Sequence, residues 1–113
     1  MTIGVAAGPT LPNRIPANVL LAQGHRAMAE RELTKRNAAG AEIEARKSIA
    51  IEPNNADAHN LLGAALASQG NLNAAIPEFQ AAIRINPKDE VALKNLAQAF
   101  AYSRSSGIAN TSK

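Results

Sequence analysis

The feature that most constrains this chain is an internal repeat. Stretches of the sequence match each other at one constant spacing, which is the separation in sequence between Pro53 and Pro87. The residues that recur are small, apolar or helix-ending. A unit of this length cannot bury its apolar side alone, so it is expected to stack on a copy of itself. The recurring residues are Pro53 and Pro87, Ala41 and Ala75, Ile49 and Ile83, Ile51 and Ile85, and the series Ala29, Gly63 and Ala97.

Turn-forming residues divide the chain into five expected helices. Pro53 and Pro87 each end one helix, because proline clashes with the preceding helical turn, and Gly70 follows another helix where a left-handed residue is favoured. Asn18 is expected to cap the first helix, and the fourth is expected to begin at Leu72 or to be capped by Asn73. The expected helices span about residues 18–35, 41–51, 56–69, 72–85 and 90–104, with Asp89 as the cap of the last.

The fifth expected helix carries Leu93, Leu96, Ala97 and Phe100 at helical spacing. This apolar side is predicted to face the stack while the polar side faces water, as the end of a repeat array requires. Residues 1–17 are rich in glycine and proline and are expected to form a flexible leader. Residues 105–113 are small and polar and are expected to form a disordered tail.

Small residues on these helices predict close crossings. Gly63 costs about 1 kcal/mol of helix propensity relative to alanine, so its presence indicates that a neighbouring helix approaches closely there. Larger side chains are expected to line the inner faces beside these crossings. They are Leu21, Met28, Ile43, Ser48 and Ile49.

Residues 56–87 resemble the tetratricopeptide repeat, through the series His59, Leu62-Gly63, Leu66, Ala75, Phe79 and Pro87. A more degenerate copy precedes it, and half a copy follows. The resemblance covers about residues 18–104 and implies an all-α, right-handed stack of helical hairpins (an α-solenoid), with repeats at about 22–53 and 56–87 and a capping helix at 90–104. The degenerate copy reads His25, Met28-Ala29, Glu32, Ala41, Ala45 and Pro53, and the half copy Leu93, Leu96-Ala97 and Phe100.

Composition excludes several classes of function. Apolar residues make up 46% of the chain but aromatic residues only 3%, so the core must be built from Ala, Leu and Ile, and few rings are available to stack on nucleic-acid bases. The net charge of +3 comes from scattered basic residues, and we expect no nucleic-acid partner. The chain has no Cys and no apolar run long enough to span a membrane. No signal peptide is expected, and a cytoplasmic location is expected.

No residue pattern predicts catalysis, a metal or a cofactor. His25 and His59 lie at matching repeat positions, a whole helix pair apart, and are interpreted as substitutes for the family's aromatic packing residue rather than as metal ligands. Glu42 and Glu44 point in different directions on a helix, so they do not form a catalytic carboxylate pair. The chain is therefore not expected to be an enzyme.

The family resemblance implies a concave groove, lined by the first helix of each repeat, that receives a peptide or a partner helix. Ala67 and Ala101 would form a shallow apolar floor, while Arg26, Asn60, Lys94 and Gln98 are candidates for binding peptide backbone or a carboxylate. The predicted partner-binding residues are Arg26, Glu30, Asp57, Asn60, Ser68, Lys94, Gln98 and Tyr102, and Gln23, Thr34 and Ala64 occupy further groove positions.

One subfamily grips a C-terminal carboxylate with Lys, Asn and Arg, but Glu30, Leu61 and Val91 at the corresponding positions do not suit that chemistry. The sequence thus predicts a protein-interaction module, either an adaptor or a scaffold. Two alternatives remain open. One is a self-associating structural protein whose open end lies near Leu20, Leu21 and Met28, and the other is an accessory domain of a larger enzyme such as a glycosyltransferase.

Overall fold

A computed structural model describes residues 15–111 of the chain, with side chains described through residue 104. These residues form five helices and no strand, which confirms the predicted all-α class. Residues 1–14 of the predicted leader and residues 112–113 of the predicted tail lie outside the described residues. The helices are α1 (Ala17–Thr34), α2 (Ala38–Ile51), α3 (Ala56–Ser68), α4 (Leu72–Ile85) and α5 (Glu90–Thr111).

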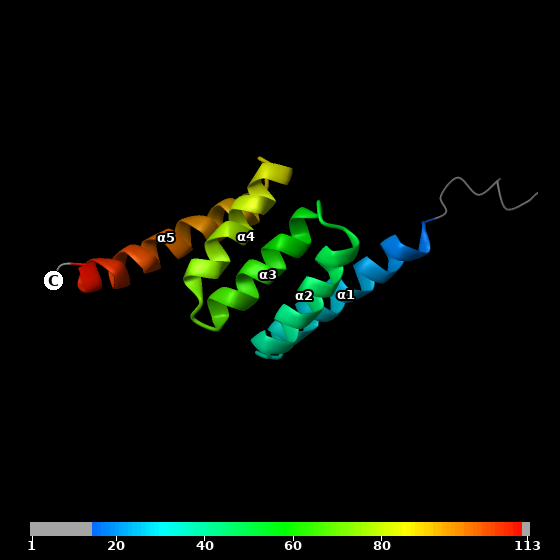
Figure 1. Cartoon of the computed structure of the whole chain (residues 1–113), viewed down its shortest axis with the longest axis horizontal. Helices are drawn as coiled ribbons and strands as arrows, with labels where there is room; N and C mark the ends of the chain where they lie inside the picture. The colour runs from blue at the N-terminus through cyan, green and yellow to red at the C-terminus, as the bar shows by residue number, and fades with distance from the viewer. Residues whose placement is uncertain (1–14, 112–113) are drawn as a thin grey trace, which may run out of the picture.

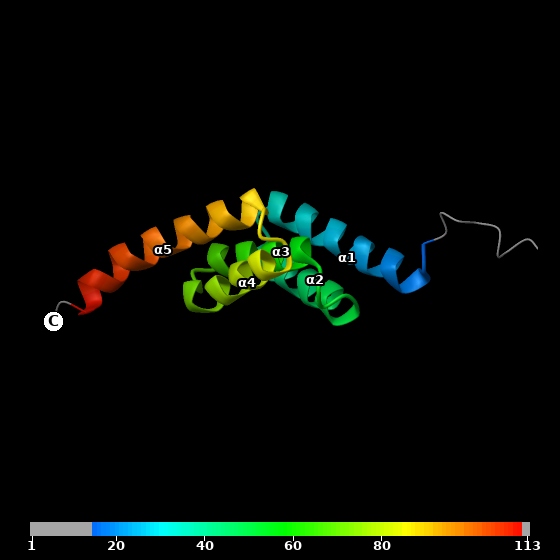
Figure 2. The same ribbon diagram turned by 90° about the horizontal axis from the view of Figure 1, so that it is seen from above.

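The helices stack in the order of the chain, and each packs on the next (Figure 1). Helices α1 and α2 form one hairpin, α3 and α4 form the second, and α5 packs on the end. Seen from above, α1 and α5 lie along one side of the molecule and α2 and α4 along the other, with α3 between them (Figure 2). The first helices of the repeats therefore build one face of the stack, and that face is where a groove is expected.

Asparagine and aspartate side chains set the starts of four helices. Asn37, Asn55, Asn71 and Asp89 each accept a hydrogen bond from the backbone N–H three residues further on, at 3.0–3.3 Å. Such caps satisfy a backbone donor that has no partner within the helix. Gly70 follows α3 with φ of +83°, the left-handed conformation that glycine adopts without strain. The predicted Asp89 cap and Gly70 turn are confirmed.

Two helix starts differ from the prediction. Helix α1 begins at Ala17 with Pro16 at its cap position, so Asn18 lies inside the helix. Helix α4 begins at Leu72, one of its two predicted starts, with Asn71 as its cap. Helix α2 begins at Ala38, because the Asn37 side chain caps it, and Gly40 belongs to the helix rather than to the preceding turn.

Helix α5 also ends later than predicted, since it continues to Thr111. The prediction of a disordered tail was therefore wrong for residues 105–111. Serine and glycine lower helix propensity by no more than about 1 kcal/mol each, and extending an existing helix needs no new nucleus. Only proline would stop it firmly, and none follows Pro87.

The core of the stack is built mainly from alanines, with Leu62 and Leu66, around one aromatic ring. Ala29, Ala45 and Ala75 are fully buried, and Phe79 is 2% exposed. A Cβ placed on Gly63 of α3 would lie 2.5 Å from Cε1 of Phe79 in α4, closer than real contacts allow. The predicted close crossing at Gly63 is thus confirmed, and its partner is the Phe79 ring.

Several residues predicted to face inward are exposed instead. The buried side of α2 falls at Ala41, Ala45 and Ser48, which leaves Ile43 on the opposite side and 54% exposed. Leu21 and Met28 lie at the α1 end of the stack, where no further helix is present within the described residues. Leu93 and Phe100 lie on a side of α5 that no described helix covers. Their exposed fractions are 56% for Leu21, 37% for Met28, 45% for Leu93 and 41% for Phe100.

The contact at Gly63 generates a first prediction. Gly63→Ala is expected to lower the free energy of unfolding by about 1–3 kcal/mol, because the new methyl group must displace the Phe79 ring from a close-packed site. Gly24→Ala in α1 is the matched control, since nothing lies within 4 Å of its Cβ position. It should raise stability by up to about 1 kcal/mol through helix propensity. Urea denaturation of both variants checks this, and shifts of the same sign would contradict it.

Ser48 generates a second prediction. It is fully buried, and its hydroxyl has no hydrogen-bond partner among the residues that the structure describes. The equivalent position in the second repeat is the fully buried Ala82, so a methyl group fits there. Ser48→Ala is expected to raise the free energy of unfolding by about 1 kcal/mol, because it removes an unsatisfied buried group. The exposed Ser68→Ala should change it by less than about 0.5 kcal/mol. A destabilised Ser48→Ala protein in the same denaturation experiment would refute this account.

Candidate functional site

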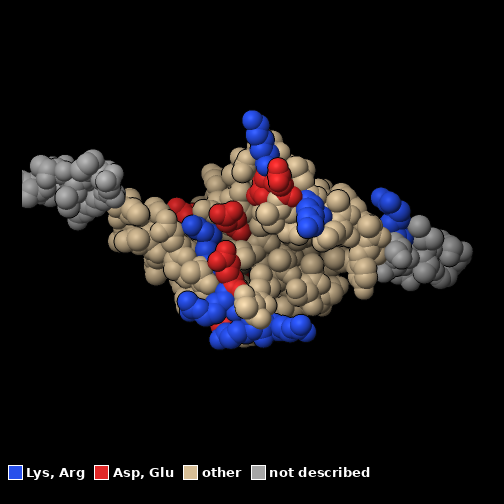
Figure 3. All heavy atoms as spheres, turned by 180° about the vertical axis from the view of Figure 1, so that it is seen from behind, with Lys and Arg blue, Asp and Glu red and all other residues tan. Residues whose placement is uncertain are grey.

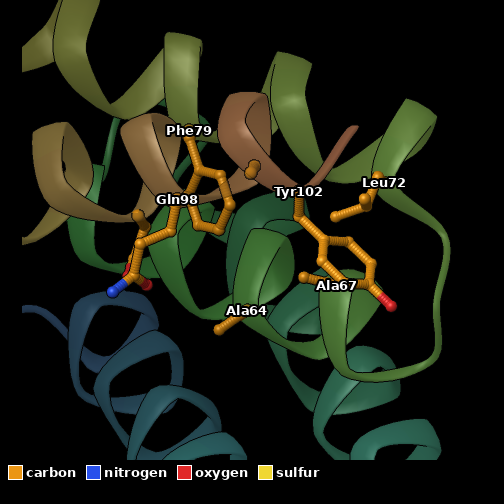
Figure 4. A pocket seen from close by; sticks show the side chains of 8 residues that line it. Ala64, Ala67, Leu72, Phe79, Gln98 and Tyr102 are labelled. Atoms are coloured by element: carbon orange, nitrogen blue, oxygen red, sulfur yellow. The ribbon is translucent and has the colours of Figure 1, made fainter. Parts of the chain in front are cut away.

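A pocket of about 410 Å³ opens between α3, α4 and α5. Figure 4 shows side chains from the three helices around it, with the Tyr102 ring over Ala67 and beside Leu72. Phe79 reaches its floor from α4, and the Gln98 side chain extends at the opposite end from Tyr102. The lining residues are Ala64, Ala67, Leu72, Phe79, Asn95, Gln98, Ala99 and Tyr102.

The floor of the pocket is buried and its rim is accessible. Phe79 is held by the Gly63 crossing and is almost wholly buried. Tyr102 is 65% exposed, so its ring stands at the edge with one face available. The amide groups of Asn95 and Gln98 add hydrogen-bond donors and acceptors beside an apolar surface. An apolar floor with a few polar groups at its edge is typical of sites that bind ligands or peptide segments.

A smaller pocket of about 320 Å³ lies in the first repeat. Its lining residues Leu33, Ala38 and Ser68 occupy the positions that Ala67, Leu72 and Tyr102 occupy in the larger pocket, one repeat later in each case. The groove is therefore repetitive, like the fold that builds it. Ser68 contributes no ring at its edge, so the aromatic contact is specific to the larger pocket.

The face built by the first helices contains an uncharged hollow. Figure 3 shows Lys, Arg, Asp and Glu over the α1 half and across the upper middle of this face, with a hollowed surface beside them that has no charged side chain. The residues that line the larger pocket are all uncharged at neutral pH. The pocket therefore offers no charged side chain to a ligand.

The predicted site residues fall into three groups. Gln98 and Tyr102 line the larger pocket, as do Ala64 and Ala67 of the predicted groove, and Ser68 lines the smaller one. Glu30, Asp57 and Lys94 are at least partly exposed but line neither pocket. The third group is Arg26 and Asn60, whose side chains are engaged within the stack.

Arg26 and Asn60 hold equivalent positions and serve equivalent structural roles. The Arg26 guanidinium donates to Oε1 of Glu52 at 3.1 Å. The Asn60 amide donates to Oδ2 of Asp89 at 2.8 Å, and Asn60 is 7% exposed rather than exposed as predicted. Each contact ties a first helix to the segment that leads into the next one. Sequence position alone places both residues on the groove side, but it does not show that a neighbouring acceptor lies within reach.

Leu72, Phe79, Asn95 and Ala99 line the larger pocket but were not predicted as site residues. Phe79 was assigned only to packing, and its second role depends on the ring being reached from the groove side of Gly63. Leu72 is the first residue of α4, so only the turn geometry brings it to the groove. The repeat offered one usable signal, because Leu33 and Ala67 hold the same position in successive repeats and line the two pockets.

The two histidines make matching contacts between the helices of their own repeats. Nδ1 of His25 donates to Oε1 of Glu44 at 2.6 Å, and Nδ1 of His59 to Oε1 of Glu78 at 2.7 Å. Each pair therefore ties the first helix of a repeat to the second, at the position where the family carries an aromatic residue. The hydrogen bond from His25 holds the pKa of the Glu44 carboxyl below its ordinary value of 4.5.

Stacked helical hairpins with a groove along one face define a helical-repeat protein. Residues 56–89, which contain α3 and α4, match the family model described as tetratricopeptide repeat. Residues 56–89 are therefore assigned as one tetratricopeptide repeat, a unit that generally serves protein interaction. A comparison with curated proteins gave no match. Within the described residues, no helix has both the length and the apolar character needed to cross a membrane.

The Glu44 contact predicts a pH dependence. A carboxyl whose pKa is lower in the folded state adds stability that is fully present above the unfolded pKa, near 4.5, and is lost as the pH falls through the folded pKa. The free energy of unfolding should therefore fall more steeply between about pH 5 and pH 3 in the unmodified protein than in Glu44→Gln. Denaturation at several pH values measures both slopes. Glu30→Gln, at an exposed glutamate, is the control, and equal slopes for the unmodified protein and Glu44→Gln would contradict the prediction.

Proposed function

We propose that this protein binds a short segment of a partner protein in the groove along α1, α3 and α5, and that the main contact is made at the larger pocket. The observation that carries the proposal is the pocket of about 410 Å³ with a buried aromatic floor and an exposed tyrosine edge. Aromatic side chains at such sites contribute large apolar contact area at low entropic cost. The family assignment supports the class of partner.

The lining residues favour an apolar anchor on the partner segment. Phe79, Leu72 and the alanines offer no partner for a buried charge, so a charged side chain entering the pocket would lose its hydration without compensation. A Leu, Met or Phe side chain would bury apolar surface there, which favours binding. The amides of Asn95 and Gln98 are placed to pair with backbone groups of the segment beside the anchor.

A C-terminal carboxylate is not required for this mode of binding. Glu30 is exposed and carries the wrong charge for a carboxylate, and Leu61 and Val91 provide no donor side chains. Arg26, the one basic residue at a corresponding position, is paired with Glu52. The partner segment is therefore proposed to bind through an internal apolar residue, in a helical or extended conformation.

A displayed library of random peptides tests the proposal, because it assumes nothing about the identity of the partner. Selected peptides are expected to share one bulky apolar residue, and calorimetry should show at least about tenfold weaker binding to Tyr102→Ala, because the ring forms the edge of the pocket. Gln98→Ala should weaken binding less. Both residues are exposed, so the variants are expected to retain the fold.

Lys94→Ala is the matched control, since Lys94 is exposed on α5 but does not line the pocket. Binding to this variant should match that of the unmodified protein. Peptides that are selected for acidic residues and lose binding with Lys94→Ala would show that charge rather than the pocket recognises the partner. Selection of no peptide at all would also count against the proposal.

A further inference from the structure

Helix α5 carries an apolar stripe on the side away from the groove. Leu93 and Phe100 are 45% and 41% exposed, and Ala97 lies between them at helical spacing. The pocket residues Gln98 and Tyr102 lie on a different side of the same helix. Exposed large apolar side chains that align on one helix face indicate a contact surface. We call this set of three residues the α5 stripe.

The two earlier repeats show what kind of element covers such a stripe. His59 and Gly63 of α3 are the equivalents of Leu93 and Ala97, and α4 covers both, with Glu78 bonded to His59 and Phe79 seated on Gly63. In the first repeat α2 covers α1 in the same way, and Glu44 bonds to His25. The stripe is therefore the place where each repeat receives an antiparallel helix. Within residues 15–111, no helix covers it on α5.

The composition of the α5 stripe excludes a copy of α2 or α4 as the best occupant. Those helices place a carboxylate opposite a histidine. Leu93 is apolar at that position, so a carboxylate packed against it would be buried without a hydrogen-bond partner. The occupant must instead place an apolar or aliphatic group opposite Leu93. It must also place a bulky ring opposite the small Ala97, as α4 places Phe79 on Gly63.

Helix α5 itself meets these requirements. We propose that α5 pairs antiparallel with α5 of a second copy of this chain, about a two-fold axis. Phe100 of the partner subunit then packs on Ala97 while the reciprocal contact forms by symmetry, so each copy covers a stripe that no helix of the described residues covers. A two-fold pair satisfies both stripes at once and closes, which prevents further growth.

Charges at the two ends of the stripe select the antiparallel direction. Glu90 lies one turn before Leu93, and Arg104 one turn after Phe100, so both extend the same line along the helix. An antiparallel pair brings Glu90 near Arg104 of the partner subunit at both ends. A parallel pair would set like charges side by side, which is unfavourable.

The proposed dimer is independent of the peptide groove. The stripe and the larger pocket occupy different sides of α5, so a dimer leaves both pockets open and presents two grooves in one particle. Linked grooves would raise the apparent affinity for a partner with two binding segments. One helix pair buries less surface than the roughly 1,200 Å² of a stable interface, so the dimer is expected to dissociate on dilution.

Sedimentation equilibrium of the full chain across micromolar to millimolar concentrations tests the proposal. The mass should rise with concentration toward that of two copies. A variant with both Leu93→Lys and Phe100→Lys should dimerise at least about tenfold more weakly, with unchanged helicity because both side chains are exposed. Val91→Lys is the matched control, since Val91 is an equally apolar, 61% exposed residue of α5 on another side of the helix.

Charge reversal tests the direction of pairing. Glu90→Arg alone or Arg104→Glu alone should weaken the antiparallel dimer, and the two changes together should restore it. In a parallel dimer each single reversal would still leave like charges facing each other, so the dimerisation affinity would not change. A chain that is monomeric at every concentration overturns the proposal. So does a dimer that ignores the lysine substitutions, which would place the interface elsewhere, for instance at Leu20 and Leu21.

Discussion

The contact between Gly63 and Phe79 is the constraint on which the rest of the structure depends. Because Gly63 has no side chain, the Phe79 ring of α4 reaches the backbone of α3 and becomes almost fully buried. The ring then fills a space that alanines alone would leave open, and its far edge forms the floor of the groove pocket. One missing methyl group thus fixes both the packing of the second repeat and the shape of the candidate site.

Polar contacts recur in successive repeats and keep the hairpins in register. The histidine–glutamate pairs join the two helices within each repeat, while the Arg26–Glu52 and Asn60–Asp89 contacts join one repeat to the next. Alanine side chains are short, so each adds few interlocking contacts between neighbouring helices. Hydrogen bonds are directional and require a specific register of the two helices that they join. Some polar residues of this stack therefore hold its helices in register, and only the remaining ones are available for contacts with a partner.

The sequence predicted features that depend on one residue and its repeat copy. The helices, the turn at Gly70 and the crossing at Gly63 follow from local backbone chemistry that recurs from one repeat to the next. The predictions failed where the outcome depends on a neighbour. Asn60 was placed in the groove because its position faces it, yet Asp89 lies within reach and holds it. Periodicity likewise marks Leu93 and Phe100 as one apolar side without showing whether a helix covers that side. Of the candidate pocket, the two α3 residues were predicted, as were Gln98 and Tyr102 of α5, whereas Asn95, Ala99 and the α4 residues were not.

Helix α5 differs from α1 and α3 in the side chains that it carries on its two sides. Toward the groove it carries Tyr102 where α3 carries Ser68, so it adds an aromatic edge that the first repeat lacks. Away from the groove it carries Leu93 where the earlier repeats carry a histidine bonded to glutamate. At the first position an exposed aromatic residue thus replaces a small one, and at the second an exposed apolar residue replaces a hydrogen-bonded histidine. Selection for stacking alone would favour the opposite exchange at the end of an array, because a terminal helix needs a polar outer face. The exposed apolar surface of α5 is therefore the observation from which the proposed pairing of two copies is argued.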